Sequence, residues 1–262
     1  MRLESTTDAT AAARVAATEI GARCREAVAA RGRALLAVSG GDTPWLMLRE
    51  LCTFALPWSN VFVAQVDERV APDGDPRRNL TRLEQILVRE GPLAAAQLLR
   101  MPVMAQDLDE GAAAYQQLLE SVGGTPLVLD LVHLGLGTDG HTASLVPGDP
   151  VLDVRDRDVA VSDAYQGLRR MTLTYPAINR ARRRLWLVTG TAKSTRLREL
   201  EEAEKVEQET FQSSANAGNR NAPIPRTAEN RNVPSSPSLR VTRDDTIVVA
   251  DEAALRGDRS PG

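Results

Sequence analysis

An apolar run over residues 127–134 passes directly into a glycine-rich stretch that reads LGLGTDGHTASL over residues 134–145. Short apolar runs bounded by turn residues are typical of strands buried on both faces, as in a parallel sheet. Glycines just after such a strand allow the backbone to turn sharply and to approach a ligand closely. His141, one of only two histidines in the chain, lies in this stretch. The pattern therefore favours an α/β fold with a functional loop at the end of a buried strand.

Strand-type and helix-type patterns alternate along the rest of the chain. Further strands are predicted at 34–38, 61–66, 97–101, 159–162, 171–174, 185–188 and 246–250. Helices are predicted at 8–30, 45–51, 78–89, 109–122, 193 to about 204, and 251–255, with a short helix or turn at 175–179. This alternation implies a mostly parallel sheet with helices on both faces. We expect residues 1–262 to form a single α/β domain.

The segment 205–237 interrupts this alternation. Asn, Gln, Ser, Pro and Arg dominate it, and apolar residues are few. Such a composition cannot bury enough apolar surface to offset the entropy that is lost on ordering. We therefore expect a mobile polar loop within the domain.

Composition narrows the classes of protein to which the chain can belong. Hydrophobic residues make up 42% and aromatic residues 3%, so the core must consist mainly of Ala, Val and Leu. The net charge of -3 gives no electrostatic footprint for nucleic acid. No apolar run approaches the ~20 residues of a membrane span, and residues 1–30 lack the apolar centre of a secretory signal. Cys24 and Cys52 lack CxxC or histidine spacing and are expected to be buried thiols, so we expect a soluble cytoplasmic protein.

Ligands of parallel α/β sheets bind beyond the carboxyl ends of the strands, and four loops at such positions carry candidate residues. In the first loop, Gly40 and Gly41 follow Ser39 and would let the backbone approach an anion. Thr43 is expected to cap the helix that Pro44 begins, and the free N–H groups of that helix would attract a phosphate. The helix dipole contributes only about 0.3–2 kcal/mol, so a phosphate would need added cations. An ordinary tight turn is the alternative.

The second and fourth loops supply charged residues. The run Asp67-Glu68-Arg69 directly follows a strand, which favours a functional role over a merely solvated loop. Lys193 lies where a helix begins, and the helix dipole disfavours a cation there. Capture of an anion would offset that cost, and an exposed lysine is the alternative.

The third loop is the glycine-rich stretch, in which residues 135–140 form a G-x-G-x-x-G pattern. Asp163 lies about where a ribose-binding acid would lie, so a dinucleotide site is one interpretation. A helix that starts at His141 can reach only Val146 before 147–148, which read Pro-Gly. A Rossmann crossover helix is normally longer, which counts against this interpretation.

A general base is the favoured role for His141, because a helix start keeps an imidazole neutral, as a general base requires. The alternative is a structural histidine. His133 lies inside the preceding strand and is expected in the core. No G-x-S-x-G pattern supports Ser39 or Ser144 as a nucleophile, and the histidine spacing indicates no metal set.

Taken together, these motifs resemble those of the 6-phosphogluconolactonase family. The matching residues are Ser39–Pro44, Asp67–Arg69 with Asn79, Leu134–Leu145 with Pro147 and Gly148, Arg170 with Thr172, Gly190–Lys193 and Asp251–Ala254. The match covers roughly residues 10–200, and the histidine loop is its most specific part. The resemblance implies a Rossmann-like fold shared with glucosamine-6-phosphate deaminases and ribose-5-phosphate isomerases. It also implies hydrolysis of 6-phospho-D-glucono-1,5-lactone in the oxidative pentose phosphate pathway, with no metal or other cofactor.

The resemblance also implies roles for individual residues. His141 would activate water, Asp139 or Asp67 would hold the imidazole or Arg69, and Arg69 or loop amides would stabilise the oxyanion. The expected phosphate and substrate ligands are Ser39, Gly40, Gly41, Thr43, Gly137, Arg170 and Lys193. A surface salt bridge is the alternative for Arg170.

The chain departs from the family pattern in places. Asp42 stands where a small or neutral residue is commoner, and we expect its carboxylate to turn away from the phosphate. Arg78 stands where Ser is frequent, Val146 replaces the usual Phe, and 205–237 is longer and more polar than the family norm.

Three other functions remain open at this point: a deaminase or isomerase of the same fold, a non-catalytic phosphosugar sensor, and an NAD-dependent oxidoreductase. The stretch 142–148 argues against the first of these. The sequence leaves the oligomeric state open.

Overall fold

The computed structural model describes residues 1–216 and 236–257, and its centre is a seven-stranded sheet. In order across the sheet, the strands are β1 (Arg2–Thr6), β10 (Thr246–Asp251), β9 (Arg184–Val188), β6 (Leu131–Leu134), β2 (Ala34–Val38), β3 (Val61–Gln65) and β5 (Leu98–Leu99). Every neighbouring pair is parallel. The carboxyl ends of these strands therefore lie at one edge of the sheet, as the alternating sequence pattern predicts.

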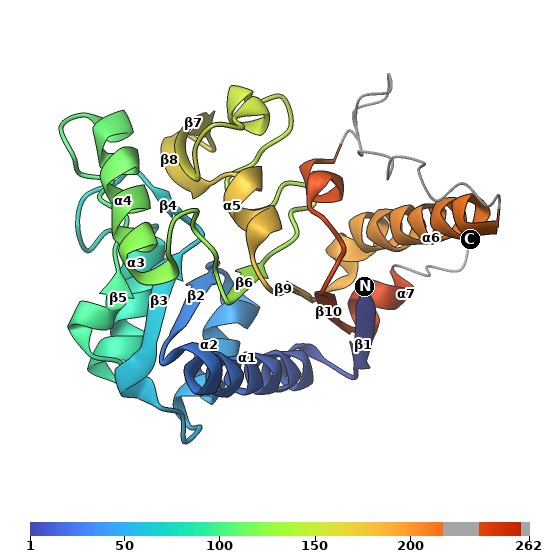
Figure 1. Cartoon of the computed structure of the whole chain (residues 1–262), viewed down its shortest axis with the longest axis horizontal. Helices are drawn as coiled ribbons and strands as arrows, with labels where there is room; N and C mark the ends of the chain where they lie inside the picture. The colour runs from blue at the N-terminus through green and yellow to red at the C-terminus, as the bar shows by residue number, and fades with distance from the viewer. Residues whose placement is uncertain (217–235, 258–262) are drawn as a thin grey trace.

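Helices cover both faces of this sheet, which confirms the predicted architecture. They are α1 (Ala9–Arg31), α2 (Asp42–Cys52), α3 (Asn79–Leu83), α4 (Leu108–Gly123), α5 (Tyr175–Arg180), α6 (Ser194–Asn216) and α7 (Glu252–Arg256). Successive residues of a strand point to opposite faces, so Leu36 packs in a core with α1 and α2 while Leu35 packs in a second core with α4. Figure 1 shows α1 and α2 on one side of the sheet and α4 and α5 on the other.

Capping residues set the two ends of α1, which lies close to the predicted helix 8–30. The Asp8 carboxylate accepts hydrogen bonds of 2.9 Å from the amides of Thr10 and Ala11. Gly32 ends the helix with a φ of 74°, a left-handed conformation that favours glycine. Alanines make up most of the buried face of α1, and their small side chains let this helix pack closely on the sheet and on α2.

A second, three-stranded antiparallel sheet lies beside the central one (Figure 1). It consists of β4 (Asp67–Arg69), β8 (Leu168–Leu173) and β7 (Val159–Tyr165). The sequence predicted the last two as strands but did not predict a separate antiparallel sheet, and it predicted Asp67–Arg69 as a loop. The loop prediction was wrong because the chain crosses between sheets at Val66, whose amide donates to Val38 O and whose carbonyl accepts from Leu173 N.

Other predicted elements differ in their bounds. β1 was missed, because its sequence RLEST is short and polar and its partner β10 lies at the other end of the chain. β6 is shorter than the predicted strand 127–134. No helix follows Gly140; residues 141–146 instead form turns, with a φ of 52° at Ala143.

The polar segment 205–237 is not loop throughout. α6 continues to Asn216, so the predicted loop is wrong for the beginning of this segment. Residues 217–235, on which most of that prediction rests, lie outside the described residues. Within residues 1–216 and 236–257, no helix is long and apolar enough to span a membrane.

Candidate active site

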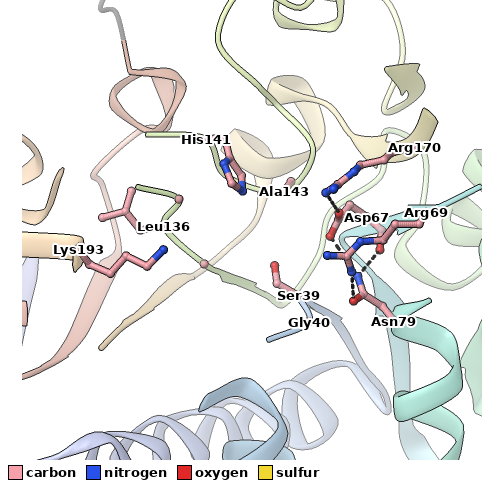
Figure 2. Close-up of a pocket in the computed structure, with 12 residues that line it drawn as sticks. Ser39, Gly40, Asp67, Arg69, Asn79, Leu136, His141, Ala143, Arg170 and Lys193 are labelled. Atoms are coloured by element: carbon pink, nitrogen blue, oxygen red, sulfur yellow. Dashed lines mark hydrogen bonds and ion pairs between the residues drawn. The ribbon is translucent and has the colours of Figure 1, made fainter. Parts of the chain in front are cut away.

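A pocket opens at the edge where the parallel strands end (Figure 2). Its lining residues follow β2, β3, β6 and β9 or come from β4, β8 and the start of α3. They are Ser39, Gly40, Asp67, Arg69, Asn79, Gly135, Leu136, Gly137, His141, Ala143, Arg170 and Lys193. The topology of the sheet thus brings together residues from all four loops that the sequence singled out.

His141 is oriented by Asp139 from within its own loop. Its Nδ1 atom lies 2.6 Å from Oδ1 of Asp139, and its backbone amide donates to the same oxygen at 3.1 Å. Because a carboxylate only accepts hydrogen bonds, the neutral imidazole carries its proton on Nδ1, which leaves Nε2 with a lone pair. The His141 side chain points into the pocket (Figure 2). This geometry is that of a general base held by an orienting carboxylate.

The carboxylate keeps its charge in this position. Burial acts to raise the pKa of Asp139, but hydrogen bonds from the His141 amide and ring and from Tyr165 outweigh it and lower the pKa. The expectation that a helix dipole tunes His141 was wrong, because no helix starts there. The orienting group is Asp139 rather than a helix end. The same absence of a helix across 141–146 removes the dinucleotide interpretation of the glycine pattern.

The close packing of His141 against Asp139 requires a glycine at position 137. A Cβ atom at this position would overlap Nδ1 of His141 and would lie 2.6 Å from Oδ1 of Asp139. The Gly137 amide also donates to the carbonyl of His141 at 2.8 Å, which closes the loop on itself. A side chain at Gly137 would therefore displace the histidine or the carboxylate.

Arg69 and Arg170 lie directly opposite each other in the pairing of β4 with β8. Such positions share one face of a sheet, so both side chains reach the pocket. Arg170 is 5% exposed, so the alternative of a surface salt bridge is wrong. Burial and then the neighbouring Arg69 lower the pKa of Arg170, while Asp67 acts in the opposite direction. Two like charges held so close favour an anionic ligand between them.

Arg69 and Arg170 together form what we call the arginine wall of the pocket. Asp67 is buried and lies beside Arg170. Its Oδ2 atom accepts from Ser144 Oγ at 2.7 Å and lies 3.9 Å from Nη1 of Arg170. The sequence offered His141 or Arg69 as its partner, and the structure gives it Arg170 instead. Arg69 donates to Oδ1 of Asn79, whose Nδ2 donates to the Asp67 carbonyl at 3.0 Å (Figure 2).

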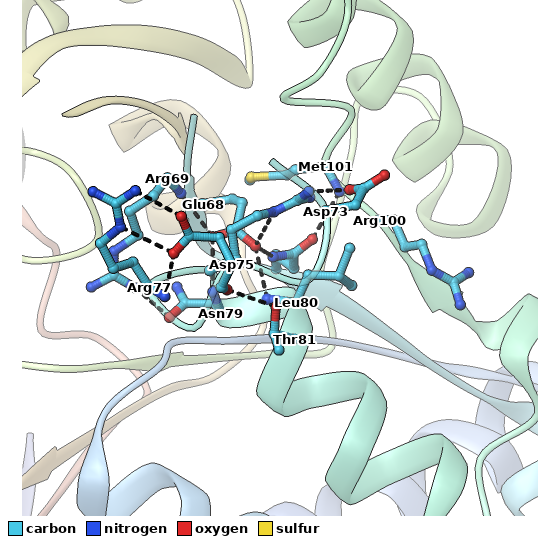
Figure 3. Close-up of polar contacts among 12 residues, drawn as sticks. Glu68, Arg69, Asp73, Asp75, Arg77, Asn79, Leu80, Thr81, Arg100 and Met101 are labelled. Atoms are coloured by element: carbon cyan, nitrogen blue, oxygen red, sulfur yellow. Dashed lines mark hydrogen bonds and ion pairs between the residues drawn. The ribbon is translucent and has the colours of Figure 1, made fainter. Parts of the chain in front are cut away.

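Glu68 does not line the pocket and instead lies in a network of polar contacts that includes Arg69 and Asn79 (Figure 3). Its fully buried carboxylate accepts from the amides of Asn79 at 2.9 Å and Leu80 at 2.8 Å, which caps the start of α3. Arg78 lies 3.6 Å from the same carboxylate and also pairs with Asp73. The unusual Arg78 is therefore a buried counter-ion whose position fixes the neighbouring Asn79.

Lys193 lies across the pocket from the two arginines (Figure 2). Burial lowers its pKa, and the negative charge of Asp139 partly opposes this. The hydroxyls of Thr43 and Thr189 are 2.7 Å apart, which ties the start of α2 to the loop that carries Lys193. An anion near this lysine would therefore also lie near the amino end of α2.

The first loop contributes less to the lining than expected. Ser39 and Gly40 line the pocket, whereas Gly41 and Thr43 lie beside it. Gly41, with a φ of 133°, precedes α2, and among the described residues no side chain caps that helix, so the expected cap by Thr43 was wrong. Asp42 is exposed and lies outside the lining.

The sequence did not predict two features of the site. Tyr165 contacts both Asp139 and His141, yet nothing in its local sequence marks it. His133 is fully buried, as expected, but its Nδ1 atom also accepts from the Ser39 amide at 3.3 Å. Both roles depend on contacts between residues that are far apart in the sequence.

The remaining titratable candidates do not form a metal centre within residues 1–216 and 236–257. No group of three or more His, Cys, Asp or Glu side chains there is arranged to hold a metal ion. Cys24 is buried as expected, whereas Cys52 is only half-buried, so that part of the expectation was wrong. Burial still raises the pKa of the Cys24 thiol to about 12 and that of Cys52 to about 11, which makes both thiols unreactive.

Comparison with known proteins finds a matching family model and relatives that are more than a third identical to this chain over the aligned residues. The family model for glucosamine-6-phosphate isomerases/6-phosphogluconolactonase matches residues 7–220. The 6-phosphogluconolactonase of Synechocystis sp. is 39% identical over 188 residues, which cover 68% of this chain and 75% of the relative. That of Rhizobium meliloti is 37% identical over 198 residues, which cover 73% and 83%.

Solved structures share the fold at low sequence identity. The 6-phosphogluconolactonase of Thermotoga maritima has a TM-score of 0.75 at 19% identity, with 95% of this chain and 98% of that chain covered. A monomeric glucosamine-6-phosphate deaminase of the NagB superfamily has a TM-score of 0.74 at 19% identity, with 98% and 99% covered. The match of the family model and the identity to its curated relatives show that this chain belongs to the glucosamine-6-phosphate isomerase/6-phosphogluconolactonase family.

Proposed function

We propose that this chain is a 6-phosphogluconolactonase, which hydrolyses 6-phospho-D-glucono-1,5-lactone to 6-phospho-D-gluconate in the oxidative pentose phosphate pathway. The observation that carries the proposal is the pairing of His141 with Asp139 at 2.6 Å in a pocket that also holds Arg69, Arg170 and Lys193. A histidine base and several cations suit a reaction in which water attacks a carbonyl of an anionic sugar. Curated relatives named 6-phosphogluconolactonase support the assignment.

In the proposed reaction, Nε2 of His141 takes a proton from water, and the resulting hydroxide attacks the C1 carbonyl carbon. The carbonyl oxygen becomes an oxyanion in a tetrahedral intermediate. As the intermediate collapses, the bond between C1 and the ring oxygen breaks, and protonated His141 returns its proton to that oxygen. Asp139 keeps the imidazole oriented and stabilises its positive charge throughout. Positioned general-base catalysis contributes about 10²–10⁴-fold.

The charged groups divide between the two ends of the substrate. We assign the 6-phosphate to Lys193 and the amino end of α2, because the link between Thr43 and Thr189 brings the start of α2 to this side. We assign the lactone carbonyl to the wall of Arg69 and Arg170. These arginines then stabilise the negative charge that develops on the carbonyl oxygen.

The test is lactone hydrolysis by the purified chain, coupled to 6-phosphogluconate dehydrogenase so that product formation is followed above spontaneous hydrolysis. His141→Ala should lower kcat at least about 100-fold, with the affinity for 6-phosphogluconate nearly intact. Turnover near that of the wild type in this variant would remove His141 from the mechanism.

A deaminase or isomerase of the same family is the second candidate, favoured by the fold shared with the glucosamine-6-phosphate deaminase. Release of ammonia from glucosamine 6-phosphate distinguishes it. Ammonia release without lactone hydrolysis would replace the proposed function, and lactone hydrolysis without ammonia release supports it.

A further inference from the structure

We propose that Tyr165 is a positioning residue that joins the His141–Asp139 pair to the arginine wall, an inference that rests on the proposed function. Tyr165 Oη donates to Oδ2 of Asp139 at 3.1 Å, while Oδ1 of the same carboxylate lies 2.6 Å from His141 Nδ1. The two oxygens of Asp139 are thus held by two different side chains. A carboxylate bound at both oxygens cannot rotate freely, so the hydroxyl of Tyr165 fixes the plane in which Asp139 meets the imidazole.

The ring of Tyr165 makes two further contacts with residues that line the pocket. Its centroid lies 5.4 Å from that of His141, with the rings inclined at 62° in an edge-on arrangement. The guanidinium of Arg170 lies over the same ring, 5.0 Å from its centroid. Tyr165 therefore touches both the base and a cation of the opposite wall.

Arg170 depends on such contacts for its position. Its Nε atom is buried and has no hydrogen-bond partner among the described residues. Its terminal nitrogens reach only weak partners, at 3.9 Å to Asp67 and 3.3 Å to Gln166. The aromatic face of Tyr165 is therefore a main support of this guanidinium.

The hairpin between β7 and β8 places Tyr165 at this point. Gln166 and Gly167 form its turn with φ values of 53° and 80°, and Tyr165 pairs with Leu168 across it. Two successive positive φ values are the geometry of a tight two-residue hairpin. Tyr165 is only half-buried, so substitutions there leave the hydrophobic core of the fold intact.

The hydroxyl and the ring have separable effects on the reaction. Tyr165→Phe removes the hydrogen bond to Asp139 and keeps the ring, so we expect kcat to fall about tenfold with KM little changed. Tyr165→Leu also removes the support of Arg170, whose proposed role is to stabilise the oxyanion, so we expect a further fall in kcat of about tenfold beyond that of Tyr165→Phe. A merely structural role would leave kcat per folded molecule unchanged in both variants.

Two measurements show whether Tyr165 acts through Asp139. In an Asp139→Ala background, Tyr165→Phe should have no further effect on kcat, because the partner of the hydroxyl is gone. In ¹⁵N spectra of histidine-labelled protein, the chain has only two histidines to assign. Tyr165→Phe should lower the fraction of His141 that carries its proton on Nδ1, and this readout needs no activity.

The control is Tyr115→Phe, since the Tyr115 hydroxyl bonds to the amide of Gln65 at 2.9 Å and to the carbonyl of Leu99 at 3.1 Å, outside the lining of the pocket. Its kcat per folded molecule should equal that of the wild type. A Tyr165→Phe enzyme with unchanged kcat and unchanged His141 spectra would overturn the inference. Absence of lactone hydrolysis in the wild-type chain would instead overturn the proposed function and leave the spectral test of Tyr165 standing.

Discussion

Asp139 lies two residues before His141 in the same loop, and their side chains meet at a distance of 2.6 Å between Oδ1 and Nδ1. The loop therefore carries both the proposed base and the group that orients it. The amide of His141 bonds to the same carboxylate oxygen, so the backbone conformation fixes the relative position of the two side chains. This arrangement needs no helix to align the imidazole.

Asp139→Asn should impair this alignment without removing the side chain. An asparagine that turns its NH₂ group toward Nδ1 stabilises the tautomer with the proton on Nε2, which cannot accept a proton from water. We expect kcat to fall by about 10²–10⁴-fold, with KM nearly unchanged. Steady-state lactonase assays measure this, and a kcat within twofold of the wild type would show that Asp139 does not orient the base.

Lys193→Ala should remove the preference for a phosphorylated substrate. If the lysine binds the 6-phosphate, its loss raises KM for 6-phosphogluconolactone but not for glucono-1,5-lactone, which has no phosphate. Loss of one charge-assisted contact of about 1.5–3 kcal/mol corresponds to roughly 10–150-fold. Arg69→Ala is the matched comparison, because it should lower kcat for both lactones. Equal losses for both substrates in Lys193→Ala would move the phosphate to the arginine wall.

Gly137→Ala should disrupt the active site through a single methyl group. The new Cβ overlaps Nδ1 of His141, so the imidazole or Asp139 must shift. A displacement of about 1 Å at a reacting group can cost about 100-fold in rate, and we expect that loss in kcat. Gly135→Ala offers a comparison in the same loop, because its Cβ meets no atom within 4 Å, so its kcat should stay far closer to that of the wild type.

Much of the site could be predicted from the sequence because parallel strands share one edge. The apolar runs at β2, β3, β6 and β9 marked the strands, and the residues that follow them had to converge. Ser39, Arg69, His141 and Lys193 were found in this way, and all of them line the pocket. Local patterns were sufficient here because each residue lies at the end of its own strand.

The features that the sequence did not predict depend on pairing between distant segments. The alignment of Arg69 with Arg170 comes from the antiparallel pairing of β4 with β8. The charged run at 67–69 does not indicate this pairing. The contact of Tyr165 with Asp139 depends on the same small sheet. The helix expected at His141 failed for a different reason, because the turns at 141–146 and the bonds to Asp139 and Gly137 replace it.

His133 should make the stability of the fold depend on pH. Burial lowers its pKa to about 3 from an ordinary value of 6.5, so the folded protein holds it neutral while the unfolded chain binds a proton below pH 6.5. The stabilisation is therefore complete above pH 6.5 and is lost as pH falls from there toward 3, by at most about 1.4 kcal/mol per pH unit. His133→Asn keeps an acceptor for the amide of Ser39 but cannot titrate. Denaturant unfolding should show that the wild type loses stability between pH 7.5 and pH 5.5. The variant should lose about 1 kcal/mol less over the same range. Equal losses in the two proteins would show that His133 is protonated to the same degree in the folded and unfolded states.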